Sequence, residues 1–295
     1  MSDFSPPWDE FRDLVRRAVA EDLPAGDPTG ALVGERPARA SLVARAAGTV
    51  AALMAAQLVL DEVSEKLGSG RAEAELHVDD GARVGAGQEL GVLAGPAETL
   101  LGAERTVLNF VTHLSGVATA TAALVEAVAG TGAVVRDTRK TLPGLRAVEK
   151  YAVRCGGGSN HRMSLSDAVL VKDNHVAAFG GVGAAVEAAL SGARSGWTAY
   201  EPLPVEVEVD DLFELDAALA AGAKFILVDN MALADMKEAV ARARRAGAQV
   251  EASGGITLAN ARAVAECGVD YIAVGALTHS APALDVGLDW GVPAP

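Results

Sequence analysis

The sequence predicts an α/β protein whose main part is an open or incomplete (β/α) barrel of about six parallel strands. Half of the residues are apolar and only 4% are aromatic, a composition typical of Ala, Val and Leu packed under a helix-covered parallel sheet. From residue 121 onward, short apolar runs alternate with helical patterns. Nearly every apolar run ends in polar or small residues, and a barrel would gather these ends around one rim.

The six strands are predicted at residues 133–136, 168–172, 205–209, 224–229, 249–253 and 271–275. Helical patterns separate them, for example at residues 231–247 and 258–268. A doubly wound sheet is the alternative arrangement for such units. It would use only the strand ends near its switch point. The barrel is favoured because almost all of the strand ends carry functional-looking groups.

The residues before the barrel predict a smaller N-terminal α/β sandwich domain. Ser5-Pro6-Pro7 and the apolar positions after it indicate an N-capped amphipathic helix with proline in its first turn. Short strands at 40–46 and 74–78, an Ala-rich helix at 51–66 and a long helix through 100–119 follow. We therefore divide the chain into a sandwich domain, residues 1–117, and a barrel domain, residues 118–277.

One turn in the first domain suggests a different class of protein. Residues 80–90, DGARVGAGQEL, resemble the tight turn of lipoyl and biotinyl carrier domains. Such carriers modify a lysine at the turn, but the chain has no lysine between Leu67 and Arg139. We interpret the segment as part of a small β-rich domain that uses the same turn geometry.

The charge and the N-terminus limit the partners and the compartment. The net charge of −14 argues against binding to anionic lipid or nucleic acid. The first residues contain acids and no apolar run, so we expect neither a signal peptide nor a membrane span, and a cytoplasmic protein. Cys155 and Cys267 lack the spacing of metal ligands and are predicted to be ordinary buried residues.

Residues 136–162 are basic although the chain is acidic. They contain seven Lys or Arg against two acids, a net charge of +5. Arg146, Lys150 and Arg154 are spaced i, i+4, i+8 and are predicted to form the solvated face of one helix. The remaining cations lie at strand ends or beside the glycine turn Gly156-Gly157-Gly158. They suit a pocket for small, multiply charged anions. These cations are Arg139, Lys140 and Arg162, with Lys172 at the end of the next strand.

Within residues 137–175 the pattern DTRKT-P-G-R--EKYAV-CGGG-NHR--L-D--L-KDNH resembles the signature of the quinolinate phosphoribosyltransferase family. The similarity extends from about Glu21 to Leu277 and includes ERT-LNF---LSG-AT near residue 110. It implies transfer of a phosphoribosyl group from phosphoribosyl pyrophosphate to quinolinate, with loss of carbon dioxide, in NAD synthesis. By analogy, the tail at 278–295 packs back on the first domain.

The resemblance also implies the site residues. Lys140, Lys172, Glu208 and Asp229 would be catalytic. The quinolinate carboxylates would bind Arg105, Arg139, His161, Arg162 and Lys172. The wider substrate-binding set adds Thr138, the two carboxylates Glu208 and Asp229, and two strand ends for the 5′-phosphate, Ser253-Gly254-Gly255 and Val274-Gly275-Ala276. Backbone N–H groups at such ends approach a phosphate closely.

Two carboxylates on one strand require partners. Glu206 and Glu208 alternate with valines and so share one face, where burial is costly without a cation. Lys140, Lys172 and a divalent ion are the available partners, and a structural pairing of Glu206 with a lysine stays open. The resemblance places Glu208 and Asp229 near the ribose hydroxyls and the pyrophosphate. Mg²⁺ is expected on that pyrophosphate, with Glu208 and Asp229 as the only candidate protein ligands.

Further expectations concern assembly and rival activities. The family resemblance implies at least a homodimer with shared active sites, in which Arg105 reaches into the partner's barrel. One alternative is a nicotinate phosphoribosyltransferase of the same fold, and another is a barrel lyase that forms a Schiff base on Lys140 or Lys172. Compared with the family pattern, residues 195–204 form a slightly long loop before the strand of Glu206.

Overall fold

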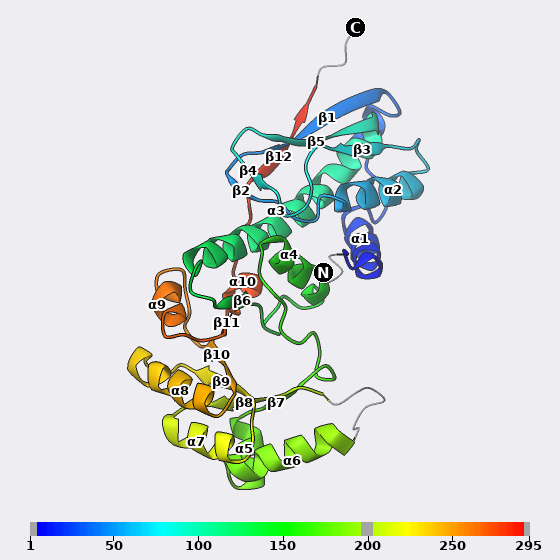
Figure 1. Cartoon of the computed structure of the whole chain (residues 1–295). Helices are drawn as coiled ribbons and strands as arrows, with labels where there is room; N and C mark the ends of the chain where they lie inside the picture. The colour runs from blue at the N-terminus through cyan, green and yellow to red at the C-terminus, as the bar shows by residue number, and fades with distance from the viewer. Residues whose placement is uncertain (1–4, 196–202, 292–295) are drawn as a thin grey trace. The chain divides into compact units, whose positions relative to one another are not determined.

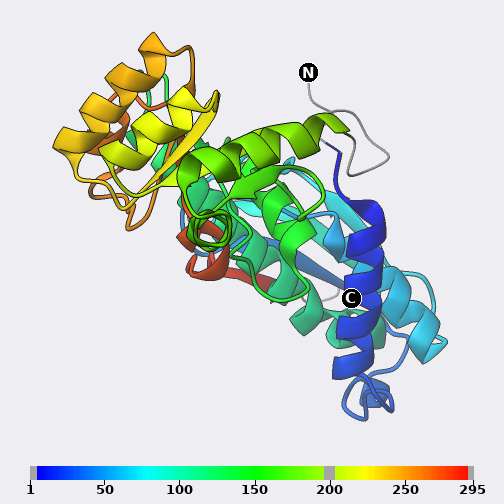
Figure 2. The ribbon, with the colours of Figure 1, turned by 90° about the horizontal axis from the view of Figure 1, so that it is seen from below.

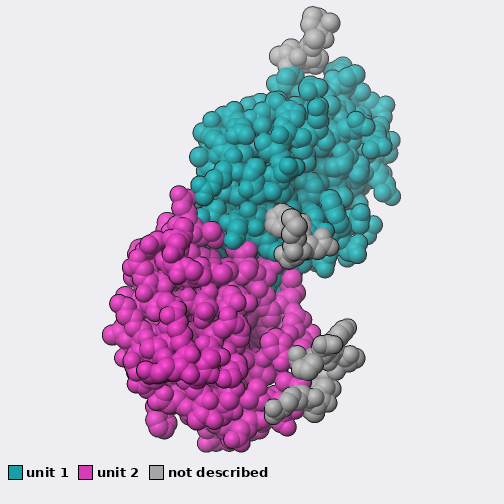
Figure 3. Space-filling view, in the orientation of Figure 1, with its two compact units in different colours: residues 1–122, 142–157, 277–295 teal, residues 123–141, 158–276 magenta. Residues whose placement is uncertain are grey.

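The computed structural model describes residues 5–195 and 203–291, which form two compact units (Figure 3). The first unit contains residues up to 122, residues 142–157 and the stretch from 277 onward. The second contains residues 123–141 and 158–276. The segment 142–157, assigned to the barrel domain on sequence, thus belongs to the first unit. Most of the predicted long loop at 195–204 lies outside the described residues.

The first unit is an antiparallel sheet packed against helices. The sheet order is β12 (Val286–Trp290), β1 (Pro37–Ala44), β5 (Glu89–Pro96) and β3 (Glu73–Leu76). A two-stranded sheet joins β2 (Gly48–Thr49) and β4 (Arg83–Val84). The helices are α1 (Trp8–Asp22), α2 (Ala55–Leu67), α3 (Ala97–Ala127) and α4 (Arg146–Cys155), with a 3-10 turn, η1 (Gly30–Leu32). Their apolar faces form one core with the sheet, which includes the fully buried Leu42, Leu60 and Leu93.

Among the unbroken helices of the described residues, α3 alone is long and apolar enough to cross a membrane. Its most apolar window is 56% buried inside the protein. Leu100, Val107 and Val111 of this helix belong to the core of the first unit. The apolar character of α3 is therefore accounted for by packing against the sheet and its neighbouring helices.

The second unit is built on six parallel strands. They are β6 (Val134–Arg136), β7 (Val169–Val171), β8 (Val205–Val209), β9 (Phe225–Asp229), β10 (Gln249–Ser253) and β11 (Tyr271–Ala273). The order β6-β11-β10-β9-β8-β7 places the first strand beside the last and leaves β6 and β7 unpaired with each other in this sheet. A doubly wound sheet would contain a switch point, and this order has none. The predicted open barrel is confirmed.

Helices cover the outside of this sheet. They are α5 (Asp173–Phe179), α6 (Val182–Ser195), α7 (Leu212–Ala220), α8 (Leu233–Arg245) and α9 (Ala261–Ala265), followed by the short α10 (Ala276–His279). α6, α7 and α8 lie side by side along β8 to β10 (Figures 1 and 2). Each strand therefore has its carboxyl end at the same rim, as expected for successive right-handed βα units.

A loop occupies part of the opening between β6 and β7. Ser159 forms a parallel bridge with Arg136, its N–H donates to the carbonyl of Val135 at 2.9 Å, and its carbonyl accepts from Asp137. The chain after the glycine turn thus runs along the free edge of β6. This placement directs the following residues, His161 and Arg162, toward the barrel interior.

The start of α1 differs from the prediction. The helix begins at Trp8, Pro7 occupies the N-cap position, and no side chain caps it. The predicted cap and first-turn proline are wrong because a residue that precedes proline is held away from helical backbone angles, so Pro6 cannot enter the first turn. Asp9 and Glu10 supply negative charge in the first turn instead.

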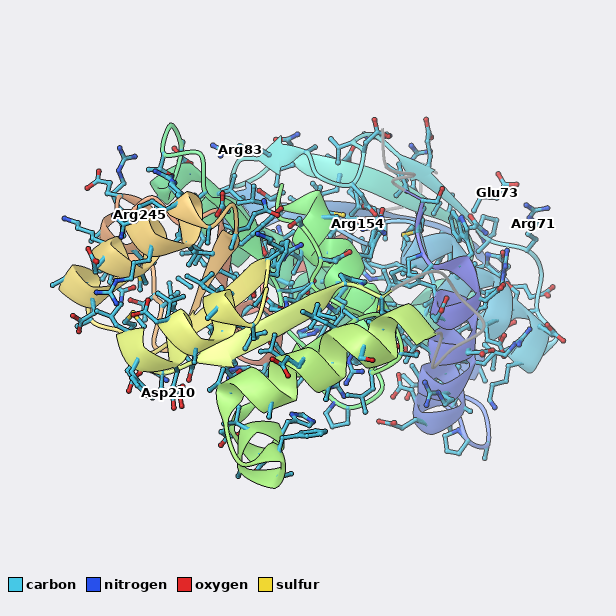
Figure 4. All side chains as sticks on the ribbon, turned by 60° about the horizontal axis from the view of Figure 1, so that its bottom comes forward. Arg71, Glu73, Arg83, Arg154, Asp210 and Arg245 are labelled. Atoms are coloured by element: carbon cyan, nitrogen blue, oxygen red, sulfur yellow. The ribbon has the colours of Figure 1, made fainter. Side chains whose placement is uncertain are left out.

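The predicted solvated face of α4 is also wrong. Lys150 is 0% exposed. Arg154, which is labelled in Figure 4, is half-buried. It donates to the carbonyl of Ser5 and lies over the ring of Tyr151. α4 is enclosed because the ring of Phe11 on α1 meets Tyr151 edge-on at 6.0 Å. The spacing of the three cations showed that they share a face, but it could not show what packs against that face.

Candidate active site

A cavity of about 360 Å³ lies inside the second unit, at the carboxyl ends of its strands. Nine of the predicted site residues line it: Thr138, Arg139, Lys140, His161, Arg162, Lys172, Glu208, Asp229 and Ser253. Leu170, Leu227, Glu251 and Ala273 complete the lining. Residues that are more than 100 positions apart in the sequence thus meet at one rim of the barrel.

The other predicted site residues lie elsewhere. Gly254, Gly255, Val274, Gly275 and Ala276 do not line the cavity itself. Arg105 belongs to the first unit, where it lies on α3 and lines a different cavity of about 260 Å³. Its side chain is exposed and has no hydrogen-bond or ion-pair partner among residues 5–195 and 203–291.

The end of β6 fixes the loop that carries His161. Asp137 is fully buried, and its carboxylate accepts hydrogen bonds from the backbone N–H of His161 at 2.9 Å and the amide of Asn160 at 2.5 Å. The next residue, Thr138, accepts the backbone N–H of Lys140 through its hydroxyl, which closes a tight turn. These contacts hold the two basic segments of the cavity close together.

Two guanidinium groups face this cavity. The Nε of Arg139 is buried and has no hydrogen-bond partner in the described part of the chain. Arg162 donates to the carbonyl of Ala168 at 2.9 Å. Burial, and then the positive charge of Arg139, lower the pKa of Arg162. Two like charges held this way favour a bound anion, which would relieve both the repulsion and the missing hydrogen bonds.

Lys172 and Glu208 form an ion pair across the neighbouring strands β7 and β8. The pair leaves 40% of the Lys172 side chain exposed to the cavity side. α5 begins directly after Lys172, and the Nδ1 atom of His175 accepts the backbone N–H of Lys172 at 3.0 Å. On the next strand, Asp229 accepts the side-chain amide of Asn230. The end of β7 thus presents a positive group, and the ends of β8 and β9 present negative ones.

The glycines after β10 make a close turn. A Cβ atom on Gly254 would lie 2.7 Å from the backbone nitrogen of Asn230, and its φ of +92° favours glycine. The carbonyl of Ser253 accepts the N–H of Asn230. Within the described residues, the N–H groups of Gly254 and Gly255 have no hydrogen-bond partner. They are available to an anion such as phosphate.

A second polar layer lies beneath the cavity. The Nε2 atom of His161 is 2.9 Å from Glu206 and 3.4 Å from Glu251. Arg136 donates to Glu251 at 2.9 Å. The partner of Glu206 is therefore His161, so the structure does not bear out the pairing with a lysine that the sequence left open. The lysines are placed elsewhere, since Lys172 is taken by Glu208.

Glu251 and Arg136 are not among the site residues predicted from the sequence. A signal was present for Glu251, because it sits at the centre of a strand whose neighbours Val250 and Ala252 are buried. The reasoning that required a partner for Glu206 applies equally there. Together with His161, the two glutamates form the one group of three in the described residues whose donor atoms all lie within 4.8 Å of one another.

The chain matches two family models along most of its length. Residues 27–115 match the N-terminal domain of quinolinate phosphoribosyl transferase, and residues 117–289 match its C-terminal domain. A nicotinate-nucleotide pyrophosphorylase [carboxylating] of Mycobacterium leprae is 48% identical over 96% of this chain and 98% of its own. A probable enzyme of the same name from Bacillus subtilis is 38% identical over 95% of this chain and 93% of its own.

Solved structures agree in the whole fold. The nicotinate-nucleotide pyrophosphorylase from Francisella tularensis superposes with a TM-score of 0.87 at 37% identity, covering 97% of this chain and 98% of that one. The match includes both units, so the resemblance seen in the sequence around residues 137–175 extends to the complete chain.

Proposed function

The chain belongs to the quinolinate phosphoribosyltransferase family, and on that premise we propose that the barrel cavity is its active site. The enzyme transfers the phosphoribosyl group of phosphoribosyl pyrophosphate to quinolinate and releases pyrophosphate and carbon dioxide, forming nicotinate mononucleotide for NAD biosynthesis. The observation that carries the assignment to this cavity is the pair of partly buried guanidinium groups, Arg139 and Arg162, that line it.

These guanidinium groups suit the two carboxylates of quinolinate. Arg139 and Arg162 bind planar carboxylates through paired N–H donors, and Lys172 adds a point charge beside them. Arg162 already uses one N–H on the carbonyl of Ala168, which fixes its orientation before the substrate arrives. The three cations thus form the acid-binding wall, and His161 closes it from the loop.

Phosphoribosyl pyrophosphate would occupy the side formed by β8 to β11. Glu208 and Asp229 end neighbouring strands and face the ribose hydroxyls, with Lys140 on the pyrophosphate. The free N–H groups of Gly254 and Gly255 bind the 5′-phosphate, and the turn Val274-Gly275-Ala276 after β11 borders it. Support comes from the position of these turns, since barrels of this kind bind phosphate after their last strands.

The carboxylates of Glu208 and Asp229 suit a Mg²⁺ ion that arrives bound to the substrate better than a site in which protein groups alone surround the ion. Glu208 is held by Lys172 and Asp229 by Asn230, so each carboxylate keeps only part of its capacity for an ion. Mg²⁺ retains water and binds substrate phosphates together with one or two carboxylates. Bound to the pyrophosphate, it would neutralise charge on the leaving group, while Lys140 and Lys172 orient the reactants.

The chemistry needs positioning and charge stabilisation. The pyridine nitrogen attacks the anomeric carbon as pyrophosphate departs, and the carboxylates Glu208 and Asp229 stabilise positive charge on the ribose. After the bond forms, the ring nitrogen is positive and accepts the electrons released when the adjacent carboxylate leaves. Arg139 and Arg162 hold the ring in one orientation throughout.

We place a second copy of the chain beside each active site. Arg105 is exposed, has no partner in the described residues, and lies on a helix of the first unit. A homodimer in which Arg105 reaches the partner's cavity would use this free cation and produce two equivalent sites. We also place the enzyme in the cytoplasm, since Cys155 and Cys267 are both free thiols, the state that this compartment maintains.

The rival activities fit the cavity less well. A Schiff base requires a free amine, whereas the amine of Lys172 is engaged in an ion pair with Glu208. Nicotinate has a single carboxylate and would leave one of the two guanidinium groups unpaired.

The decisive test is product analysis with each acid. Purified enzyme, phosphoribosyl pyrophosphate and Mg²⁺ are incubated with quinolinate or with nicotinate, and mononucleotide and carbon dioxide are quantified. We expect equal amounts of both products from quinolinate and a kcat/KM for nicotinate at least about 100-fold lower. Equal turnover of the two acids would refute the assignment of two cations to two carboxylates.

A further inference from the structure

Two carboxylates are buried together beneath the cavity, on strands separated by one other strand. Glu206 of β8 is 6% exposed and Glu251 of β10 is 0% exposed. The Oε1 atom of each is buried without a hydrogen-bond partner in the described residues. Both carboxylates approach the same Nε2 atom of His161, at 2.9 and 3.4 Å. Their negative charges are therefore close and poorly solvated.

Two cations act on this pair, Arg136 on Glu251 and Arg162 on Glu206. Arg136 of β6 donates to Glu251, and its guanidinium is fixed 3.9 Å from the centre of the Tyr271 ring of β11. The intervening strand β9 contributes the uncharged Leu227 at this level. Above, Lys172 is engaged by Glu208. Glu206 also faces the positive charge of Arg162. The charged or titratable groups around the two carboxylates are thus Arg136, Arg162 and His161.

The two ring nitrogens of His161 have different partners. Its Nδ1 atom accepts the backbone N–H of Arg162 at 2.8 Å, so this nitrogen bears no proton. The single ring proton is on Nε2 and points at Glu206 and Glu251. Both ring nitrogens of His161 thus have partners within the protein. The Oε1 atoms of Glu206 and Glu251 still lack hydrogen-bond partners in the described residues, and like charges this close and this poorly solvated favour one retained proton.

The burial of Glu251 agrees with a retained proton. Desolvation, and then the charge of Glu206, raise the pKa of Glu251 to about 7, against the opposing effects of His161 and Arg136. A divalent metal would be the other way to neutralise the cluster. A metal-bound histidine donates its second ring N–H to a neighbour, whereas the second nitrogen of His161 accepts one. The hydrogen bonding therefore favours a proton over a metal.

The reaction consumes one proton at carbon 2 of the pyridine ring, where a hydrogen replaces the departing carboxylate. We propose that Glu251 supplies this proton, directly or through one water molecule, from the floor of the cavity. The bond between carbon 2 and the carboxylate breaks and leaves its electron pair on carbon 2. The O–H bond of Glu251 then breaks as the new C–H bond forms, and solvent later returns a proton to the carboxylate. The inference rests on the decarboxylating reaction described above.

The first test compares Glu251→Gln with Glu187→Gln, a substitution at an exposed position of α6. Glutamine keeps the shape and a hydrogen bond to Arg136 but has no acidic proton. In Glu251→Gln we expect the kcat for formation of nicotinate mononucleotide to fall at least 10-fold. The KM values for quinolinate and for phosphoribosyl pyrophosphate should each change less than about threefold. In the wild type, kcat should decline as pH rises through about 7, because the protonated form is required. This decline should be absent in Glu251→Gln and unchanged in Glu187→Gln.

A second variant decides the case if Glu251→Gln does not fold. Glu206→Gln removes the neighbouring negative charge, so Glu251 should lose its proton more easily and the decline in kcat should move to lower pH. A decline that stays at the wild-type pH in Glu206→Gln, or a Glu251→Gln enzyme with wild-type kcat, overturns the proposal. So does one divalent metal ion per wild-type chain by elemental analysis. A wild type that forms no mononucleotide would instead refute the activity itself.

Discussion

The buried carboxylate of Asp137 accepts the backbone N–H of His161 at 2.9 Å, across 24 positions of sequence. Asp137 follows β6, and the bond joins the loop after the glycine turn to the open edge of the barrel. Asp137 does not line the barrel cavity, yet it sets where His161 and Arg162 lie. It is a positioning residue for the acid-binding wall.

Asp137→Ala should lower both stability and activity. It leaves the N–H of His161 and the amide of Asn160 unsatisfied in a buried place, at a cost of about 1–3 kcal/mol each. The loop then loses its fixed position, and we expect the KM for quinolinate to rise more than the KM for phosphoribosyl pyrophosphate. Thermal unfolding and steady-state kinetics check this, with exposed Asp235→Ala as the control. A variant with wild-type kinetics would contradict the positioning role.

Lys172→Ala should cost far more activity than Lys237→Ala. Lys172 ends β7 and lines the cavity, while Lys237 is exposed on α8. Lys150 is unsuitable as the comparison because it is fully buried and its truncation would disturb the first unit. We expect a loss of roughly 100-fold or more in kcat/KM for Lys172→Ala, from about 3 kcal/mol of lost charge stabilisation, and less than twofold for the control. Similar losses in both would place the site on another element.

The two sides of the cavity should give different kinetic signatures. Arg139→Ala or Arg162→Ala removes a partly buried cation that binds a quinolinate carboxylate, which costs about 2–4 kcal/mol, and should mainly raise the KM for quinolinate. Glu208→Ala or Asp229→Ala should impair use of phosphoribosyl pyrophosphate and shift the Mg²⁺ dependence. Arg245→Ala, on the outer surface of α8, is the control (Figure 4). Indistinguishable profiles for all four variants would refute this division of labour.

Gly156→Ala should destabilise the first unit with little direct effect on chemistry. An added Cβ would lie 2.4 Å from the carbonyl oxygen of Ala118 on α3, and backbone cannot move aside cheaply. We expect about 1–3 kcal/mol of lost stability, measured by chemical denaturation. Gly85→Ala, where a Cβ meets nothing within 4 Å, is the matched control. Equal stability of both variants would show that α4 can shift to make room.

Mixed dimers test whether Arg105 serves the partner's site. Inactive Arg105→Ala and inactive Lys172→Ala are refolded together and the heterodimer content is measured by mass. If sites are shared, each heterodimer has one intact site and one with both defects. Random mixing makes half of the dimers mixed, so roughly a quarter of all sites should work. No recovery, with heterodimers present, would assign Arg105 to its own subunit.

Much of the barrel could be predicted from the sequence. The predicted strand at 205–209 coincides with β8, and those at 224–229 and 249–253 agree with β9 and β10 to within one residue. β9 is a continuous apolar run, the pattern that buried parallel strands produce, and β8 alternates valine with glutamate at the period of a strand. The polar residues that follow them therefore met in one cavity, as the barrel geometry requires.

The rest depended on tertiary packing, which a linear pattern does not contain. Lys150 has the spacing of a surface cation, but α1 and α3 cover its helix. Glu206 required a partner, and the choice of His161 followed from the loop that Asp137 holds against β6. Assignment of Arg105 to a site could not be made from one chain, since α3 places it in the first unit.

The pairing of β12 with β1 determines when the first unit can finish folding during synthesis. Residues 40–44 of β1 bond to residues 286–290, so this edge of β1 has no partner until the last part of the chain has left the ribosome. The six barrel strands, at residues 134–273, emerge before that. The barrel can therefore assemble first. Until β12 is synthesised, the edge of β1 stays unpaired, and chaperones or a neighbouring nascent chain could bind it.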